Sequence, residues 1–499
     1  MRQFKSTILI LIFYAGALAV ALSPLVVLPI AALLPWELDV MVLAGLAVSL
    51  LVGPIILWAI VPRKSTPDLD GVALNPAKQG TLFGFLRSVA KRTKQAAPSL
   101  LMVNTAAHAS TGFYAGFAGF SSQRVLSVGL PYFAVMSVNE LSALLAHELG
   151  HFYRGSMFYW AWIVETQHAI GRFFGKLEKH WPRLIPVFER ILTPFVKACL
   201  EVSREQELAA DRFAAEHFGA DTLRQAIEKT RQLEIDYGLY FQSEVLPVIH
   251  AGYAPPLLEG FAHFREGLRR GLEPRFRLAV KTDARMPVVE LPAMTPEFLT
   301  HPDFDARIDA IRGGGWVSRG ADERPAVALI EDLAALELRL LNWEAQKRGL
   351  GTLRPLPWRE AGEQVYLAQW RELAQRHGEV LEGVAMRDLP GLVRGAAELG
   401  ARLLRTANYL PDREQCSEHA LQYLTAAGCA ALAEDGWQLS YDRAGLARAF
   451  EKNGRRVDLF EVMEKLAWEE MASFEWEDTS EELGIAKLRL MATSASHAG

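Results

Sequence analysis

Two long runs of apolar residues without a charged side chain stand at the start of the sequence. Residues 6–36 form the first run and residues 40–62 the second, and only Glu37-Leu38-Asp39 separates them. Each run exceeds the roughly 20 apolar residues that a helix needs to cross a bilayer. Because so short a turn forces the helices to run antiparallel, residues 1–64 are predicted to form a transmembrane hairpin. Pro24 and Pro29 predict that the end of the first helix is kinked or lies at the membrane interface.

Basic residues flank the outer ends of this hairpin. Arg2 and Lys5 precede it and Arg63 and Lys64 follow it, whereas the connecting turn carries only acids. By the positive-inside rule, both ends and the remaining chain are expected on the cytoplasmic side of a bacterial inner membrane. The alternative is a cleaved signal peptide, because small residues also follow the basic start.

Residues 65–315 have the mixed pattern of a domain with helices and a small sheet. A helix is expected at residues 82–94 and strands at residues 99–104 and 125–129, and the Gly- and aromatic-rich residues 111–119 predict an edge strand or a flexible ribbon. Ser137-Val138-Asn139-Glu140 is a capping box, so a helix is predicted to begin there and to run through His151.

Two further regions are predicted to be helical. In the first, residues 157–164 are too short to span a bilayer, and Pro186 and Pro194 interrupt a basic amphipathic stretch. This region predicts either helices resting on the membrane face or a buried helical hairpin. Residues 316–499 are predicted to form an all-α domain of unassigned role, with a helix at 326–347, a linker at 351–357 and helical spacing over 383–465. This domain is a candidate for binding a protein partner.

Composition excludes some classes of protein. The net charge of −5 provides no basic field for nucleic acid, so no nucleic-acid partner is expected. The three cysteines, Cys199, Cys416 and Cys429, lie far apart, which argues against a disulfide framework and fits a reducing compartment.

The strongest chemical signal is His147-Glu148-Leu149-Gly150-His151. On a helix, His147 and His151 lie one turn apart on one face, so their ring nitrogens can converge on a single zinc ion. Glu148 lies beside the metal without binding it, and we expect it to act as the catalytic base. Gly150 predicts that another element approaches this helix closely.

A catalytic zinc needs a third protein ligand and an open position. The best candidate is Glu207, with Asp211 four residues later on the same face, where it can accept the spare N–H of a ligand histidine. Arg204, one turn earlier, is expected to pair with Asp211 or Glu207.

At this point the sequence resembles the HtpX-like and CAAX prenyl protease family of membrane zinc metallopeptidases. Four motifs carry the resemblance in the family's order: Val103-Asn104-Thr105-Ala106-Ala107-His108-Ala109, residues 139–151, Ser203-Arg204 with Glu207 and Asp211, and Thr300-His301-Pro302 followed by Arg307-Ile308. The resemblance covers about residues 1–315, and it implies a zincin-like α+β fold of the gluzincin type.

The resemblance also implies roles that spacing alone does not reveal. His301 is expected near the zinc, where it would stabilise the oxyanion or gate the open metal position. The stretch that starts at Asn104 is expected to begin the edge strand to which a polypeptide substrate adds, with Asn104 as a substrate-binding residue. The activity implied is hydrolysis of peptide bonds with one catalytic Zn²⁺, in quality control of membrane or unfolded proteins.

Departures from the family pattern bear on the substrate. His108 alters the stretch after Asn104, about ninety residues separate Asp211 from His301, and residues 316–499 match nothing in the family. Two other functions therefore remain open. One is a dedicated precursor-processing protease, and the other is a non-proteolytic membrane scaffold with a structural zinc.

Overall fold

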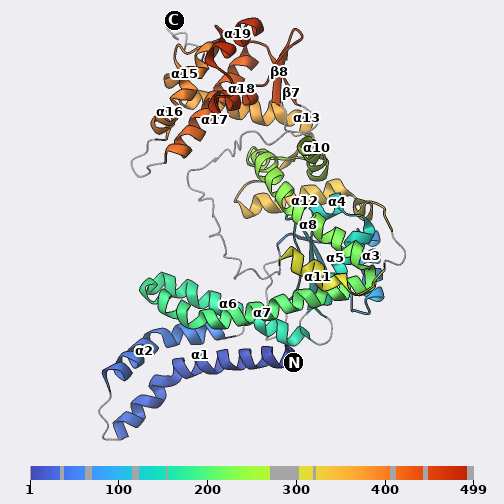
Figure 1. Ribbon diagram of the computed structural model, residues 1–499, viewed down its shortest axis with the longest axis vertical. Coiled ribbons are helices and arrows are strands. Elements are labelled where there is room, and N and C mark those ends of the chain that lie inside the picture. Colours follow the sequence, from blue (N-terminus) through green and yellow to red (C-terminus); the bar gives the residue numbers. More distant parts are fainter. Residues whose placement is uncertain are drawn as a thin grey trace. The chain divides into compact units, whose positions relative to one another are not determined.

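A computed structural model describes residues 2–33, 39–61, 70–114, 123–152, 156–269, 303–317, 322–404, 412–441 and 448–491 (Figure 1). The chain forms two compact units. The first comprises Met1–Glu234 and Pro287–Glu331, and the second comprises Ile235–Met286 and Asp332–Gly499. Each unit is therefore built from two separate stretches of sequence. The division into domains at residues 64 and 315 stays a prediction.

Two apolar helices, α1 (Arg2–Leu33) and α2 (Val40–Ile60), begin the first unit. Both are long and apolar enough to cross a membrane, over Leu11–Ile30 and Val40–Ile60. Only 11% and 28% of these stretches are buried in protein, whereas the core helix of a soluble protein would be mostly covered. The two helices indicate a membrane-anchored protein, as predicted. Helix α1 continues through Pro24 and Pro29, and the predicted kink or interfacial end stays a prediction.

A second helical pair packs against the first. Helices α6 (Ser156–His180) and α7 (Ile185–Phe218), joined by the short turn η2 (Pro182–Leu184), run beside α1 and α2 (Figure 1). Phe173 and Leu177 of α6 share an apolar core with Val52 and Ile56 of α2. Residues 157–164 belong to the longer helix α6. This hairpin is covered on one face by the apolar helices and leaves other side chains exposed.

A four-stranded sheet with the order β1-β2-β4-β3 lies in the same unit. Its strands are β1 (Val72–Ala73), β2 (Leu100–Asn104), β3 (Ala109–Tyr114) and β4 (Gln123–Gly129). Strand β2 runs parallel to β4, and β3 pairs antiparallel with β4. The strands predicted at residues 99–104 and 125–129 are confirmed, and β3 overlaps the edge strand or ribbon predicted at residues 111–119.

Helices surround this sheet and carry the candidate site. They are α3 (Gly80–Arg92), α4 (Leu130–Val135), α5 (Val138–Gly150), α8 (Ala220–Tyr240), which ends in the second unit, and α11 (Phe304–Arg312). Helices α5 and α7 cross at Gly150, where an added Cβ would lie 3.1 Å from Ala210 Cα. The close approach predicted from this glycine is therefore confirmed, and α7 is the helix that makes it.

Residues 322–331 form a segment, named the strap, that bonds to the first turns of two helices in the first unit. The carbonyls of Asp322 and Arg324 accept hydrogen bonds from the N–H groups of Asn139 and Val138, both at 2.9 Å. At the other end of the strap, Glu331 accepts hydrogen bonds from the N–H and the hydroxyl of Thr81, at 2.9 and 2.6 Å. The strap therefore satisfies free N–H groups at the starts of α5 and α3.

The second unit is mainly helical, as predicted for the C-terminal region. Its helices are α9 (Leu246–His250), α10 (Leu257–Arg269), α12 (Leu333–Lys347), α13 (Trp358–Ala361), α14 (Ala368–Arg376), α15 (Leu389–Arg394), α16 (Ala396–Leu403), α17 (Arg413–Glu434), α18 (Leu459–Ala467) and α19 (Ser473–Leu483). The helix predicted from residue 326 begins later, at Leu333, because Ile330 is extended and Asp332 caps α12.

Small sheets add to these helices. Strand β5 (Tyr253–Ala254) pairs in parallel with β6 (Arg354–Pro355), which lies within the predicted linker. Strands β7 (Gln438–Tyr441), β8 (Arg448–Lys452) and β9 (Arg455–Val457) form an antiparallel sheet that helical spacing did not indicate. Tyr240 lies in an aromatic core with Phe261, Phe264 and Trp358.

Candidate metal centre

Helix α5 holds the two histidines in place through its well-anchored start. The predicted capping box is present, with the Ser137 hydroxyl bonded to Glu140 N–H and the Glu140 carboxylate bonded to Ser137 N–H. Lys229 adds a cation 2.7 Å from the same carboxylate. His147 lies on the last turn of α5 and His151 is its C-cap residue, and their ring centroids are 5.0 Å apart. The spacing predicted from the sequence therefore brings both rings together.

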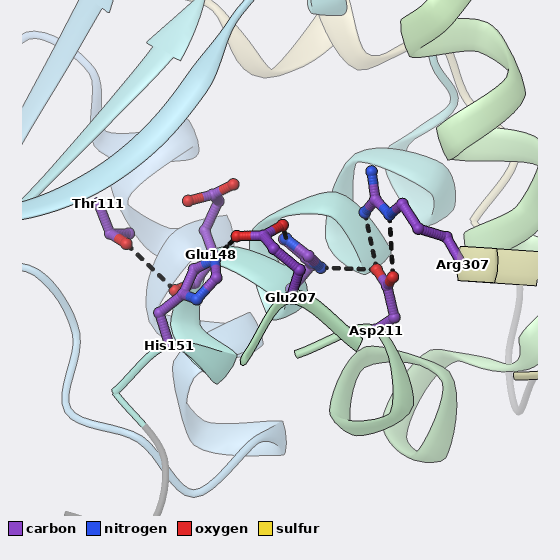
Figure 2. Close-up of polar contacts among 7 residues, drawn as sticks. Thr111, Glu148, His151, Glu207, Asp211 and Arg307 are labelled. Atoms are coloured by element: carbon purple, nitrogen blue, oxygen red, sulfur yellow. Dashed lines mark hydrogen bonds and ion pairs between the residues drawn. The ribbon is translucent and has the colours of Figure 1, made fainter. Parts of the chain in front are cut away.

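Glu207 on α7 faces both imidazoles (Figure 2). Its two carboxylate oxygens lie 3.4 Å from His147 Nε2 and 3.5 Å from His151 Nε2. Ligand atoms about 2.0–2.1 Å from a zinc ion at tetrahedral angles lie about 3.3 Å from one another. The two carboxylate–imidazole separations are therefore close to those of ligands that share one tetrahedral ion.

Two carboxylates, Glu148 and Glu207, lie near the imidazoles. Ligand atoms of Glu148, His147 and His151 all lie within 4.8 Å of one another. Glu207 bridges the two rings, with one carboxylate oxygen near each Nε2. This arrangement is compatible with Glu207 as the third ligand and Glu148 as the base, and both roles stay predictions.

Asp211 orients the first histidine from one turn further along α7. Its Oδ1 lies 2.8 Å from His147 Nδ1, so the other ring nitrogen, Nε2, is directed towards Glu207. Arg307 of α11 donates two hydrogen bonds to Asp211, from Nε at 2.9 Å and from a terminal nitrogen at 2.7 Å (Figure 2). Three helices thus contribute to one chain of contacts that ends at the metal-binding nitrogen.

The charges in this chain of contacts are strongly coupled. Burial lowers the pKa of His147, but the charge and hydrogen bond of Asp211 outweigh this effect and raise it to about 10. Burial also tends to raise the pKa of Asp211, yet Arg307 and His147 hold it below its ordinary value. Asp211 is therefore an anion, and it makes the imidazole beside it more basic.

The edge strand β3 lies beside the base. The Thr111 hydroxyl donates a hydrogen bond of 3.4 Å to the backbone carbonyl of Glu148 (Figure 2). Among the described residues β3 pairs only with β4, so no described strand pairs with its other edge. An extended peptide added there would lie next to the metal centre.

Other residues predicted for the site are placed differently. Asn104 ends β2, which lies between β1 and β4, and it is buried with its side chain bonded to Ser127 and to Ala106 N–H. The edge strand β3 begins at Ala109, the last residue of the motif that contains Asn104, and Asn104 shapes the bend that precedes it. Its contact with substrate stays a prediction.

Arg204 and His301 complete the set. Arg204 is half-buried one turn before Glu207, whereas the guanidinium that pairs with Asp211 belongs to Arg307. In the sequence, Arg307 stands out only as part of an Arg-Ile motif. No spacing rule connects it with Asp211, which lies 96 positions away. His301 lies outside the described residues, so its expected role stays a prediction. His217 bonds the carbonyl of Phe213 on its own helix.

The fold and this centre define a metallopeptidase of the His-Glu-x-x-His class. Residues 76–314 match the model of peptidase family M48. This is the family of the HtpX-like and CAAX prenyl zinc metallopeptidases, so the predicted resemblance is confirmed over this stretch of the chain. The comparisons with curated proteins and with solved structures give no match.

Proposed function

We propose that this chain is a membrane-anchored, zinc-dependent endopeptidase that cleaves extended polypeptide segments. The observation that carries the proposal is the convergence of His147, His151 and Glu207 at separations close to those of a zinc tetrahedron, with Glu148 beside them. Membership of the M48 family over residues 76–314 supports the same reaction class.

The three converging residues would hold the ion and leave a further position for the reaction. When bound, zinc would polarise the scissile carbonyl and make a water molecule more acidic. Glu148 would take the proton from the attacking water and return it to the leaving amine. Asp211 fixes the orientation of His147, and Arg307 keeps Asp211 charged. From the family resemblance, His301 would stabilise the oxyanion.

The edge of β3 that pairs with no described strand supports an extended polypeptide as the substrate. A segment that adds to this edge is bound mainly through its backbone, so many sequences would be accepted. Folded proteins seldom offer such a segment, whereas unfolded or damaged ones do. We therefore propose a role in quality control of membrane or unfolded proteins. A protein partner of the second unit would add selectivity.

The bilayer is the other proposed partner. The metal centre and the two membrane-length helices belong to the same compact unit, which supports cleavage close to a membrane surface. The basic residues that flank α1 and α2 in the sequence support a cytoplasmic site at a bacterial inner membrane.

The test combines zinc content with cleavage of casein by the detergent-solubilised chain. Glu148→Gln should keep about one zinc per chain and lose at least about 100-fold in turnover, because the base is absent. Glu207→Ala should lose the zinc. Glu216→Ala, an exposed acid on the same helix, is the matched control and should change neither quantity.

Two results would contradict the proposal. Equal cleavage by the unmutated chain and Glu148→Gln would exclude Glu148 as the base, and equal zinc content in Glu207→Ala would exclude Glu207 as the third ligand. Zinc binding without cleavage in every variant would instead favour the scaffold hypothesis with a structural zinc.

A further inference from the structure

The α6–α7 hairpin shares a core with both membrane-length helices. Its Phe173 and Leu177 pack against Ala21 of α1 and against residues 52–60 of α2. Phe195 of α7 stacks on Phe13 of α1 with ring centroids 5.1 Å apart. These contact positions on α1 and α2 all lie within the candidate spans Leu11–Ile30 and Val40–Ile60. Part of the hairpin therefore lies at the same depth as the spans.

The length of α2 shows that part of the α6–α7 hairpin must enter the membrane. Its 21 residues extend about 31 Å, at 1.5 Å per residue. The hydrocarbon core that they must cross is about 30 Å thick. Residues 52–60, about 13 Å of this helix, cannot then stand in water while the rest crosses the bilayer. The side chains of α6 and α7 that cover them must enter one leaflet.

Polar contacts mark the level at which the hairpin enters. Arg172 of α6 donates hydrogen bonds to the carbonyl of Ala59 near the end of α2, and it pairs with Glu165 at 2.7 Å. Lys176 lies 5.0 Å from the ring centroid of Trp58. An arginine that satisfies a terminal carbonyl and a lysine over a tryptophan are typical of the boundary between headgroups and acyl chains.

The end of the hairpin combines exposed apolar side chains with cations. Val187 and Ile191 lie one turn apart on α7 and are 54% and 63% exposed. Lys179, Arg183 and Arg190 are exposed around them, and no described carboxylate forms an ion pair with any of the three. Such a surface is suited to acyl chains at its apolar positions and to lipid phosphates at its cations.

We propose that the α6–α7 hairpin is a wedge that enters one leaflet without crossing the bilayer. Val187 and Ile191 contact acyl chains, while Lys179, Arg183 and Arg190 draw anionic headgroups and water towards the tip. The proposal rests on the membrane anchoring in the proposed function. Since α7 continues as one helix from the wedge to Glu207, the wedge holds the metal centre at a fixed height above the membrane.

Nitroxide labels can measure this depth in the full chain, reconstituted in vesicles of phosphatidylcholine with phosphatidylglycerol. Labels are placed at Val187→Cys and Ile191→Cys, with Val48→Cys in α2 and Trp468→Cys in the second unit as membrane and water controls. The unmutated chain, whose three cysteines are buried, gives the background. The measured quantity is the ratio of the label's collision rate with oxygen to its collision rate with a water-soluble nickel complex. This ratio should be several-fold higher at positions 187 and 191 than at 468, and highest at 48.

Other outcomes overturn the wedge. If positions 187 and 191 match position 468 while 48 is deep, the hairpin lies outside the membrane although the anchor holds. If a Lys179→Cys variant reacts with an impermeant maleimide from the side opposite the metal centre, the hairpin crosses the bilayer. If position 48 is itself exposed to water, the anchoring fails, and casein cleavage in detergent still tests the peptidase independently.

The role of the cations has its own test. Anionic lipid should raise the melting temperature of the reconstituted chain relative to phosphatidylcholine alone. The triple variant Lys179→Gln, Arg183→Gln, Arg190→Gln should lose at least half of that rise. A triple variant of exposed arginines in the second unit, Arg359→Gln, Arg371→Gln, Arg376→Gln, should keep it. An equal rise in both triple variants would show that the tip cations bind no headgroups.

Discussion

Both units bury helical carboxylates, and two of these acids, Asp211 and Glu337, behave in opposite ways. Asp211 of the first unit is fully buried, and Glu337 of the second is 6% exposed. Arg307 and His147 surround Asp211 and hold its pKa below the ordinary value. Glu337 pairs with no described cation and accepts the Leu258 N–H at 2.8 Å. Burial raises its pKa to about 7.

This difference shows that burial alone does not decide the charge of an acid. Desolvation opposes ionisation in both places, but only Asp211 has two cationic partners in hydrogen-bonding contact. Asp211 can therefore act as a permanent anion behind a metal ligand. Glu337 instead gains or loses a proton near neutral pH, so it makes the stability of its surroundings depend on pH.

Asp211→Ala is expected to have the largest effect, on both stability and zinc affinity, because it removes the buried anion that distinguishes this site from that of Glu337. Arg307 would be left as a buried cation without its carboxylate, which costs about 3–5 kcal/mol in the free energy of unfolding. Zinc affinity should fall about 10- to 100-fold, because His147 loses the group that orients it. Thermal unfolding and competition with a zinc chelator measure the two losses.

A double variant separates these two contributions. Asp211→Ala with Arg307→Met removes the orphaned charge, so most of the lost stability should return. Zinc affinity should remain low, because nothing orients His147. Recovery of full zinc affinity in the double variant would show that Asp211 does not act through the histidine.

Glu337→Gln is expected to have the next largest effect, because it changes how the stability of the fold depends on pH. The folded pKa of about 7 lies above the ordinary 4.5, so the proton of Glu337 stabilises the fold below about pH 4.5. This contribution is lost as pH rises through 7, by about 3 kcal/mol in total. A glutamine side chain cannot ionise, so Glu337→Gln should match the unmutated chain at pH 5 and exceed it in stability at pH 8.

Hydrogen exchange over α12 measures this effect locally, after correction for the pH dependence of intrinsic exchange. The amides of α12 should be better protected in the variant than in the unmutated chain at pH 8 only. Identical protection of the two chains at both pH values would mean that ionisation of Glu337 does not destabilise the fold in this range.

Arg307→Lys should have a smaller effect, because it keeps the charge beside Asp211 but loses the paired hydrogen bonds of the guanidinium. We expect a loss of about 1–2 kcal/mol in unfolding free energy. Zinc affinity should fall less than in Asp211→Ala. A loss as large as that of Asp211→Ala, in the same assays, would show that geometry rather than charge holds Asp211.

The smallest effect is expected from Tyr237→Phe, in the surroundings of Glu337. The buried hydroxyl of Tyr237 has no hydrogen-bond partner among the described residues, so its removal should change stability by less than about 0.5 kcal/mol. Tyr240→Phe is the matched control, because its hydroxyl donates to the Leu257 carbonyl at 3.0 Å and should cost about 1 kcal/mol. Equal costs in thermal unfolding would point to an unseen partner of Tyr237.

Local signals in the sequence predicted much of the fold. The capping box at Ser137 fixed the start of α5, and uninterrupted apolar runs predicted α1 and α2. Features of the fold that depend on contacts between residues far apart in the sequence were predicted less well. The late start of α12 follows from the left-handed backbone at Asp332, and the β7–β9 sheet depends on pairing that helical composition concealed.

The residues of the candidate site also divide into those predicted from spacing on one helix and those that depend on the tertiary fold. His147, Glu148 and His151 follow from spacing on one helix, and Glu207 and Asp211 from spacing on a second. Arg307 could not be found by spacing, because its helix meets α7 only through the tertiary fold. The motif at Asn104 indicated that the edge strand follows, but the position of the Asn104 strand inside the sheet could not be predicted, because the sequence does not reveal the order of strands.

The discontinuity of the first unit has a consequence for biosynthesis. Residues 235–286, which belong to the second unit, leave the ribosome before Arg307 and the strap at residues 322–331. At about 5–20 residues per second, several seconds pass between the emergence of Asp211 and that of Arg307. A nascent chain thus carries its two histidines and Glu207 before the arginine that secures Asp211. The peptidase centre is completed only after most of the first unit is already in place.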